Sequence, residues 1–337
     1  MKILFTGGLG YIGSHTAVEF LNYGYDVVIA DNLSNSKENV TYKIEKITGK
    51  KVKFYNVDVC DENKLEKIFI ENSDIFAVIH FAGYKAVGES VREPLKYYEN
   101  NMVSTFNLLK LMKKYDVKNL IFSSSATVYA QSDVMPIDET FSLSASNPYG
   151  RTKLFNEYVL TDFQKANPEF NITLLRYFNP IGAHDSGLLG EDPNGIPNNL
   201  MPYICKVATK ELEILSIFGN DYKTKDGTGV RDYIHVMDLA VGHLKAMVQI
   251  ENNVNNGLKV YNLGTGTGYS VLDIVQAFNR VNGDLVKYKI VDRRPGDIDE
   301  CFASPKKAEE ELGFKAEKTL DDMCRSSYLF QLNNKKK

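Results

Sequence analysis

Residues 2–13 read Lys2-Ile3-Leu4-Phe5-Thr6-Gly7-Gly8-Leu9-Gly10-Tyr11-Ile12-Gly13, and this stretch decides the fold. Its first five residues predict a short buried strand, and the residues from Ile12 onward predict a helix. Gly7, Gly10 and Gly13 let the chain turn tightly, let the backbone approach a pyrophosphate and let the helix pack on its strand. The start of that helix would offer free N–H groups to the anion. A glycine-rich hairpin loop is the alternative interpretation.

A second strand is expected at residues 26–30 and ends at Asp31, which follows Gly13 by 18 residues. A carboxylate at this position can accept hydrogen bonds from an adenosine ribose, and its charge would repel a 2′-phosphate. Strand, glycine loop, helix, strand and terminal acid together predict a dinucleotide-binding unit that takes NAD rather than NADP.

Strand and helix patterns alternate along the rest of the N-terminal half. Strands are expected at 52–56, 76–81, 119–123 and 172–177, and helices at 62–71, 105–115 and 148–164. This alternation predicts an α/β fold with a Rossmann-type, doubly wound parallel sheet and a smaller, mixed α/β, C-terminal substrate-binding domain. We expect the NAD-binding domain at 1–180 and the mainly substrate-binding domain at 181–337, with some chain returning to the first domain.

Ligands of such sheets bind at the carboxyl ends of the strands. The sequence places polar or glycine-containing segments at four of these ends, namely Asp58-Val59, Phe81-Ala82-Gly83, Ser123-Ser124-Ser125 and Asn179. These segments therefore predict one shared site.

The pentapeptide Tyr149-Gly150-Arg151-Thr152-Lys153 places a phenol and an ammonium four residues apart, and so on one face of a helix. The cation can stabilise the phenolate and lower a phenol pKa that is otherwise about 10. A tyrosine tuned in this way can take a proton from a sugar alcohol near neutral pH. A chance pairing on a surface helix is the alternative when the pentapeptide is taken alone.

Composition is typical of an enzyme with a sizeable core, because 43% of the 337 residues are hydrophobic and 25% are charged. The net charge of −3 gives no electrostatic reason to expect nucleic acid or an acidic membrane surface as a partner. No apolar run is long enough to span a bilayer and no leader precedes the first strand, so we expect a cytoplasmic protein. The four cysteines lack C-x-x-C spacing and the five histidines lack paired-ligand spacing, which predicts reduced thiols and no metal site.

Longer strings extend these motifs from residue 2 to about residue 325: FTGGLGYIGSHTAVEFL, HFAGYKAVGESV, FSSSATVY, NPYGRTK, RYFNPIGAH, GIPNNLMPY and GTGVRDYIHVMDLA. With these strings the chain resembles the UDP-glucose 4-epimerase family of the extended short-chain dehydrogenases/reductases. The resemblance implies a catalytic triad of Ser125, Tyr149 and Lys153. Ser125 is chosen from three consecutive serines because it lies four residues before Tyr129.

The same resemblance implies the residues of a cofactor site and a substrate site. Beside the glycine loop, the implied NAD contacts are Tyr11, Ile12, Asp31, Asn32, Asp58, Val59, Phe81, Ala82, Gly83, Lys85, Asn100, Tyr149, Lys153 and Phe178. The implied UDP-sugar contacts are Lys85, Ser125, Tyr149, Tyr177, Asn179, Asn199, Leu200, Phe218, Arg231, Arg294 and Cys301. Arg231 and Arg294 would hold the diphosphate, since planar guanidinium groups bind phosphate oxygens bidentately.

The implied reaction is the reversible interconversion of UDP-glucose and UDP-galactose, an isomerase step of galactose metabolism. One site would oxidise C4 to a ketone with tightly bound NAD, let the keto sugar present its other face and reduce it with inverted configuration. Cys301 occupies a position that is a bulky tyrosine in some members and a small residue in those that also accept N-acetylated UDP-hexosamines. We therefore expect turnover of UDP-GlcNAc and UDP-GalNAc as well. Family resemblance also implies a homodimer.

Three alternatives compete with this interpretation. A nucleotide-sugar 4,6-dehydratase would carry Asp and Glu directly after the triad Ser or Thr, where this chain has Ala126 and Thr127. A 4-epimerase of another UDP-sugar, such as a UDP-pentose, is an alternative that would use the same residues. A catalytically retired NAD-binding regulator would be expected to lose Tyr149 and Lys153, which are intact.

The run Gly264-Thr265-Gly266-Thr267-Gly268 could suggest a second nucleotide site. It lacks the fingerprint spacing and a following acidic strand end, so it predicts a loop before a capped helix at Ser270.

Overall fold

The computed structural model describes residues 1–194, 197, 199–252, 257–294 and 297–335, and the chain forms two compact units. Unit 1 comprises Met1–Ala130, Thr140–Tyr177 and Ala240–Tyr261. Unit 2 comprises Gln131–Glu139, Phe178–Leu239 and Asn262–Lys337. Each unit is therefore assembled from three separate segments of the chain.

Unit 1 is built on a seven-stranded sheet with the order β10-β6-β5-β4-β1-β2-β3. Neighbouring strands from β3 to β6 run parallel and in continuous register, apart from a shift after Lys2 in the β1–β4 pair. The order reverses direction between β1 and β4, which is the switch point of a doubly wound sheet. The Rossmann-type fold expected from the sequence is thus confirmed. The strands are β1 (Lys2–Thr6), β2 (Asp26–Asp31), β3 (Lys53–Asn56), β4 (Ile75–His80), β5 (Asn119–Ser125), β6 (Asn171–Tyr177) and β10 (Leu258–Leu263).

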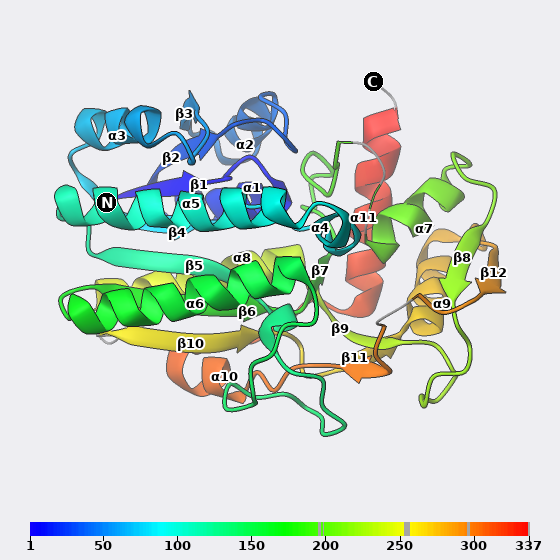
Figure 1. Cartoon of the computed structure of the whole chain (residues 1–337). Coiled ribbons are helices and arrows are strands. Elements are labelled where there is room, and N and C mark those ends of the chain that lie inside the picture. Colours follow the sequence, from blue (N-terminus) through cyan, green and yellow to red (C-terminus); the bar gives the residue numbers. More distant parts are fainter. Residues whose placement is uncertain (195–196, 198, 253–256, 295–296, 336–337) are drawn as a thin grey trace. The chain divides into compact units, whose positions relative to one another are not determined.

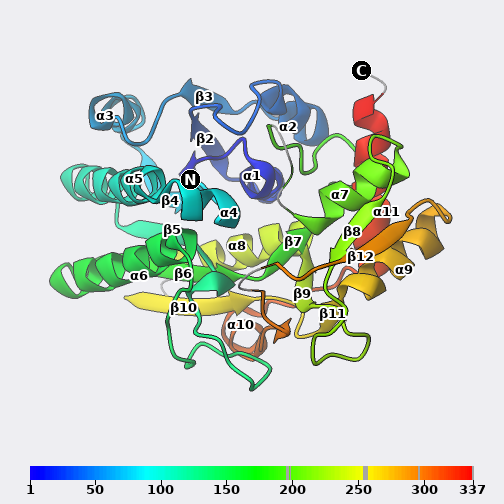
Figure 2. The same cartoon turned by 45° about the vertical axis from the view of Figure 1, so that its right-hand side comes forward.

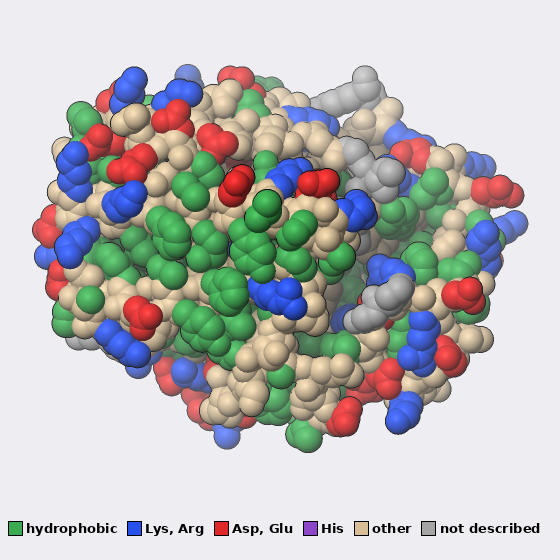
Figure 3. Space-filling model, in the orientation of Figure 1, with side chains coloured by type: hydrophobic (Ala, Val, Ile, Leu, Met, Phe, Trp, Pro, Cys, Tyr) green, Lys and Arg blue, Asp and Glu red, His purple; other side chains and the backbone are tan. Residues whose placement is uncertain are grey.

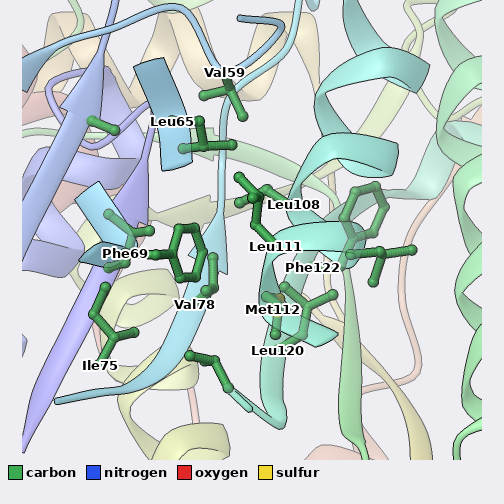
Figure 4. Close-up of a cluster of buried hydrophobic side chains, with 14 of the residues drawn as sticks. Val59, Leu65, Phe69, Ile75, Val78, Leu108, Leu111, Met112, Leu120 and Phe122 are labelled. Carbon is green, nitrogen blue, oxygen red and sulfur yellow. The ribbon is translucent and has the colours of Figure 1, made fainter. Parts of the chain in front are cut away.

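Helices cover both faces of this sheet (Figures 1 and 2). One face carries α3 (Glu62–Glu71), α5 (Pro94–Lys114) and α6 (Pro148–Ala166), and the other carries α1 (Tyr11–Tyr23), α2 (Val40–Thr48) and α8 (Val236–Glu251). The short elements α4 (Val87–Arg92) and η1 (Ala126–Val128) follow β4 and β5. Apolar side chains of α3, α5 and the central strands interlock in one buried cluster, drawn in Figure 4, and this core fixes the strand ends that carry the predicted site.

The helix expected at 105–115 is longer than the sequence indicated, because α5 starts at Pro94. Its first half is polar, but Tyr97 and Asn101 are buried there and hold neighbouring loops. Proline is well placed in the first turn of a helix, where its missing N–H has no partner to lose. The tertiary contacts of these two side chains explain a helix that hydrophobic periodicity alone did not predict.

Unit 2 has its own small sheets and its own core. Strand β9 pairs with β7 and β13 in parallel and with β11 antiparallel, and β8 pairs with β12 in parallel. The capped helix expected after the second glycine run is present, since Ser270 and Asp273 form a capping box. The strands are β7 (Asn179–Ile181), β8 (Leu215–Phe218), β9 (Val230–His235), β11 (Gly268–Ser270), β12 (Tyr288–Val291) and β13 (Glu300–Cys301). The helices are α7 (Leu200–Ala208), α9 (Val271–Asn282), α10 (Lys306–Leu312) and α11 (Leu320–Lys335).

Within the described ranges, no helix combines the length and apolar character that crossing a membrane requires. All four cysteines are free thiols. Among the described residues, His, Cys, Asp and Glu side chains form no group of three or more that could hold a metal ion.

Candidate functional site

The glycine loop between β1 and α1 is packed so closely that side chains would not fit. A Cβ atom at Gly7, where φ is +69°, would lie 2.7 Å from the backbone nitrogen of Ala82. One at Gly13 would lie 2.7 Å from the carbonyl oxygen of Gly7. Helix α1 begins after Gly10, which offers no side chain to cap its first N–H groups. The loop and the helix start therefore form a backbone-lined cradle of the kind that binds pyrophosphate.

Asp31 lies at the carboxyl end of β2 and ties the second strand to this loop. Its Oδ2 accepts a hydrogen bond from the backbone N–H of Leu9 at 3.1 Å. Its Oδ1 accepts from the N–H of Leu33 at 2.9 Å and from the Ser36 hydroxyl at 2.8 Å. The carboxylate is 6% exposed, so its position beside the glycine loop is fixed by three donors.

The other residues of the expected cofactor site in unit 1 lie after the ends of β2, β3 and β4 or on helices α1 and α5. The Asn32 amide donates to Asp58 at 3.0 Å, and the N–H groups of Phe81 and Ala82 both donate to the carbonyl oxygen of Thr6. Val59 is buried, Gly83 and Lys85 are exposed, and Tyr11, Ile12 and Asn100 are half-buried. Phe178 belongs to unit 2, where its N–H donates to the carbonyl oxygen of Leu263.

Ser125 and Tyr149 meet at the end of β5 and the start of α6. Pro148 opens α6, and the Asn147 side chain caps the helix by accepting from the N–H of Gly150 at 2.9 Å. This cap presents Tyr149 in the first turn, where the side chain is half-buried. Burial raises the pKa of the Tyr149 phenol, and the hydrogen bond with the Ser125 hydroxyl opposes that rise. Tyr149 is thus a neutral phenol at neutral pH in this structure.

Lys153 is buried one turn further along α6 but does not lower the pKa of Tyr149 as the sequence suggested. Its Nζ donates to the carbonyl oxygen of Ser123 at 2.6 Å and lies 4.9 Å from the centre of the Phe122 ring. Burial lowers the pKa of Lys153 to about 8, and the charge of Glu157 acts in the opposite direction. The expected direction for the phenol pKa is therefore wrong for this structure, because the desolvation of Tyr149 dominates.

Two buried histidines border this group. The Tyr177 hydroxyl hydrogen-bonds to His243 Nε2 at 2.6 Å, and burial raises the pKa of Tyr177. His80 lies between Thr6 Oγ1 at 2.7 Å and Thr105 Oγ1 at 3.3 Å. Burial, assisted by the charge of Lys153, lowers the pKa of His80 to about 3, so this imidazole is neutral.

In unit 2, Arg231 and Arg294 converge on one carboxylate. Arg294 Nε donates to Asp297 Oδ2 at 3.0 Å, and the Arg231 guanidinium lies 4.0 Å from Asp297 Oδ1. The Arg294 guanidinium also lies 4.9 Å from the ring centre of Phe218. Guanidinium groups of this kind can bind phosphate oxygens, and a phosphate here would compete with Asp297 for them.

The remaining expected substrate residues of unit 2 lie on nearby strands or at a helix start. Cys301 on β13 pairs with Arg231 on β9, and Asn179 on β7 pairs with Tyr233 on β9. Cys301 is half-buried, and burial raises its pKa to about 11, so it is an inert thiol. Asn199 precedes α7, which begins at Leu200, and its amide donates to Glu191 at 2.7 Å.

Sequence reasoning missed several residues that organise these sites. Asn101 donates to Thr152 and to the carbonyl oxygen of Tyr84 and accepts from the N–H of Tyr84, so it joins α5, α6 and the loop after β4. Asp232 accepts from the N–H groups of Thr265, Gly266 and Ala303 and so holds the second glycine run. A carboxylate in the middle of a strand, directly after Arg231, was the available signal for Asp232.

Comparison with known proteins agrees with this arrangement. A family model described as GDP-mannose 4,6 dehydratase matches residues 4–327. The UDP-glucose 4-epimerase of Bacillus subtilis (strain 168) is 58% identical over 334 residues, which cover 99% of this chain and 98% of that protein.

Solved structures give the same result. A UDP-glucose 4-epimerase from Bifidobacterium longum, in complex with NAD+ and UDP, is 54% identical, with a TM-score of 0.95 and 99% of each chain covered. One from Stenotrophomonas maltophila, with bound NAD and formylated UDP-arabinopyranose, is 46% identical, with a TM-score of 0.97 and coverage of 100% of this chain and 99% of that chain. With its glycine cradle, its Ser125–Tyr149 contact and these relatives, the chain belongs to the UDP-glucose 4-epimerase family.

Proposed function

We propose that this protein is an NAD-dependent isomerase that interconverts UDP-glucose and UDP-galactose by inverting C4 of the sugar. The observation that carries the proposal is the Ser125–Tyr149 hydrogen bond, which lies in the same unit as the buried Lys153 and the glycine cradle. Relatives that are more than half identical over nearly the whole chain are named for this reaction.

The residues of unit 1 fit NAD. The cradle at Gly7 and Gly13 has room only for backbone, as a closely approaching pyrophosphate requires, and Asp31 is fixed beside it for the adenosine ribose. When bound, NAD would supply a hydride acceptor for C4 and, once reduced, a hydride donor. We assign cofactor binding to unit 1 and UDP-sugar binding mainly to unit 2.

Tyr149 would take the proton of the sugar 4-hydroxyl and later return it to the 4-keto oxygen. Ser125 would hydrogen-bond the same oxygen and so stabilise charge that develops on it. Lys153 would hold the nicotinamide ribose through its ammonium, and the hydrogen bond with Ser125 would favour the phenolate that Tyr149 must form against the cost of its burial. One tyrosine can serve both half-reactions if the keto sugar rotates between them and presents its opposite face.

Arg231 and Arg294 would hold the diphosphate while the keto sugar rotates. Guanidinium groups keep their charge and bind two phosphate oxygens at once. Binding energy concentrated on the uridine diphosphate would leave the hexose free to rotate.

Cys301 supports turnover of the N-acetylated substrates UDP-GlcNAc and UDP-GalNAc. Its side chain is much smaller than tyrosine, and it lies on β13 directly beside the strand residue Arg231. Space next to the diphosphate group would admit an acetamido substituent.

A homodimer is the proposed assembly. Exposed apolar side chains form a patch on α5 and α6, which Figure 3 shows as hydrophobic surface on the face in view. We call it the α5/α6 patch, and its members are Leu95, Val103, Phe106, Phe155 and Tyr158. Leu95 is 72% exposed, and a patch of this kind is typical of an interface that is self-complementary about a two-fold axis. We also propose a cytoplasmic location, for which the four free thiols give support.

The deciding experiment follows UDP-galactose to UDP-glucose conversion by the purified protein without added cofactor. We expect turnover, NAD released on denaturation, and no accumulation of free NADH. Tyr149→Phe should lose at least about a hundredfold in kcat, the usual scale of a general acid–base group, and should still contain NAD. Wild-type protein that holds NAD but converts no UDP-hexose would refute the proposal.

A further inference from the structure

A buried charged network lies beneath the predicted triad in unit 1. The Glu157 carboxylate accepts from Arg176 Nε at 3.0 Å, from Arg176 Nη2 at 2.6 Å and from the Ser124 hydroxyl. Arg176 also donates to the Tyr129 hydroxyl at 3.0 Å and stacks over the Tyr129 ring, 4.8 Å from its centre. Glu157 is 3% exposed and Arg176 is 4% exposed, so the two ions depend on each other.

Three members of this network, Ser124, Arg176 and Glu157, are each joined through the backbone to a residue of the predicted site. Ser124 precedes Ser125 on β5, and it pairs in register with Arg176, while Ser125 pairs with Tyr177. Glu157 follows Lys153 by one turn of α6. The network therefore connects the end of β5, the end of β6 and the reactive turn of α6, which are the three elements that must stay aligned.

The Glu157 carboxylate also affects the charge state of the buried Lys153 ammonium. That ammonium is buried against the Phe122 ring and bonded to a neutral carbonyl oxygen, and burial lowers its pKa to about 8. The neighbouring His80 is neutral, and Tyr149 on the same helix is an uncharged phenol. Glu157 is the group whose charge acts on Lys153 in the direction that keeps it protonated.

We propose that Glu157, locked to Arg176, is a positioning residue for the reaction: it ties the strand end bearing Ser125 to the helix turn bearing Lys153, and it balances the Lys153 ammonium. It touches neither substrate nor cofactor in this role and acts through Lys153. Arg176 holds the carboxylate in place, since a bidentate pair fixes both oxygens.

The test is the pH dependence of kcat in Glu157→Gln, which keeps the side-chain shape and removes the charge. Lys153 should then lose its proton at lower pH, so the alkaline limb of the profile should move down by about one pH unit, the usual effect of one opposite charge. Activity above that limb should fall about tenfold, with little loss at lower pH. A purely structural role would lower kcat equally at every pH.

Controls separate charge from packing. Glu157→Gln leaves Arg176 unpaired, so the double variant Glu157→Gln with Arg176→Gln removes both buried charges together and should show the same shift. Glu157→Asp should restore the alkaline limb. Glu66→Gln removes a carboxylate of α3 that pairs with Lys114 and the Tyr115 hydroxyl, and it should leave the profile unchanged.

The proposal is overturned if the alkaline limb does not move in a folded variant that lacks the Glu157 charge. It is also overturned if the protein folds only when the Glu157–Arg176 ion pair is intact. The proposal rests on the proposed function, and the two fail separately. Wild-type protein without epimerase activity refutes the function, whereas an active wild type with an unchanged variant profile refutes only the role of Glu157.

Discussion

Adding one methyl group at Gly13 should remove the cofactor without unfolding the protein. The new Cβ would lie 2.7 Å from the Gly7 carbonyl oxygen and 2.8 Å from the Gly8 Cα atom, and both are backbone atoms that cannot rotate away. Overpacking of this kind costs about 1–3 kcal/mol. Alanine regains about 1 kcal/mol because it favours the helix more than glycine does. The net cost is up to about 2 kcal/mol. The glycine loop can relieve this cost by shifting toward the space where the pyrophosphate would bind.

A shift of the loop should weaken NAD binding at least tenfold, which corresponds to about 1.4 kcal/mol. The assay compares NAD content of the purified Gly13→Ala protein, its affinity for added NAD, and its thermal unfolding. Gly88→Ala is the matched control, since a Cβ there would meet only the Arg92 guanidinium at 3.9 Å. We expect the control to retain NAD and the wild-type Tm. A Gly13→Ala protein with full NAD content and unchanged Tm would refute the cradle argument.

Three further predictions concern the charge of Lys153, the substrate pocket and the assembly. The rate of epimerisation should fall as pH rises through about 8, because the buried Lys153 ammonium then loses its proton; a flat profile across this range would contradict the role given to its charge. Cys301→Tyr should lower turnover of UDP-GalNAc by at least about tenfold through loss of space and spare UDP-galactose, so an equal loss on both substrates would count against the pocket assignment. Phe106→Glu, which places a charge in the α5/α6 patch, should produce monomers in light scattering, whereas the same change at Tyr42, exposed on α2, should not.

The sequence predicted the elements of the parallel sheet because their signals are local. The strand before Gly7, the strand that ends at Asp31 and the helix that starts at Pro148 each combine a periodic pattern with a residue that favours a strand or helix end. Such signals need no knowledge of the rest of the chain, so the sheet and its reactive ends could be placed in advance.

The parts that sequence reasoning missed depend on contacts between distant segments. Glu157 and Arg176 form an ion pair because α6 packs beside the paired strands β5 and β6. Nothing in the sequence around either residue indicates its partner. The direction of the Tyr149 pKa was also missed, because i and i+4 spacing gives a shared face but says nothing about the desolvation of the phenol. Side-chain environment, rather than helix geometry, decides which charge state is favoured.

The division of each unit into three segments has a consequence for how the protein is made. The chain passes between the units five times, after Ala130, Glu139, Tyr177, Leu239 and Tyr261. Strand β10 is the edge partner of β6, and α8 supplies the His243 that holds Tyr177, so a nascent chain that has emerged only to residue 180 lacks both. The seven-stranded sheet can be completed only after residues up to Leu263 have left the ribosome, when two of the three segments of unit 2 have already been made. A fragment cut near residue 180 should expose an unpaired β6 edge that is prone to aggregation.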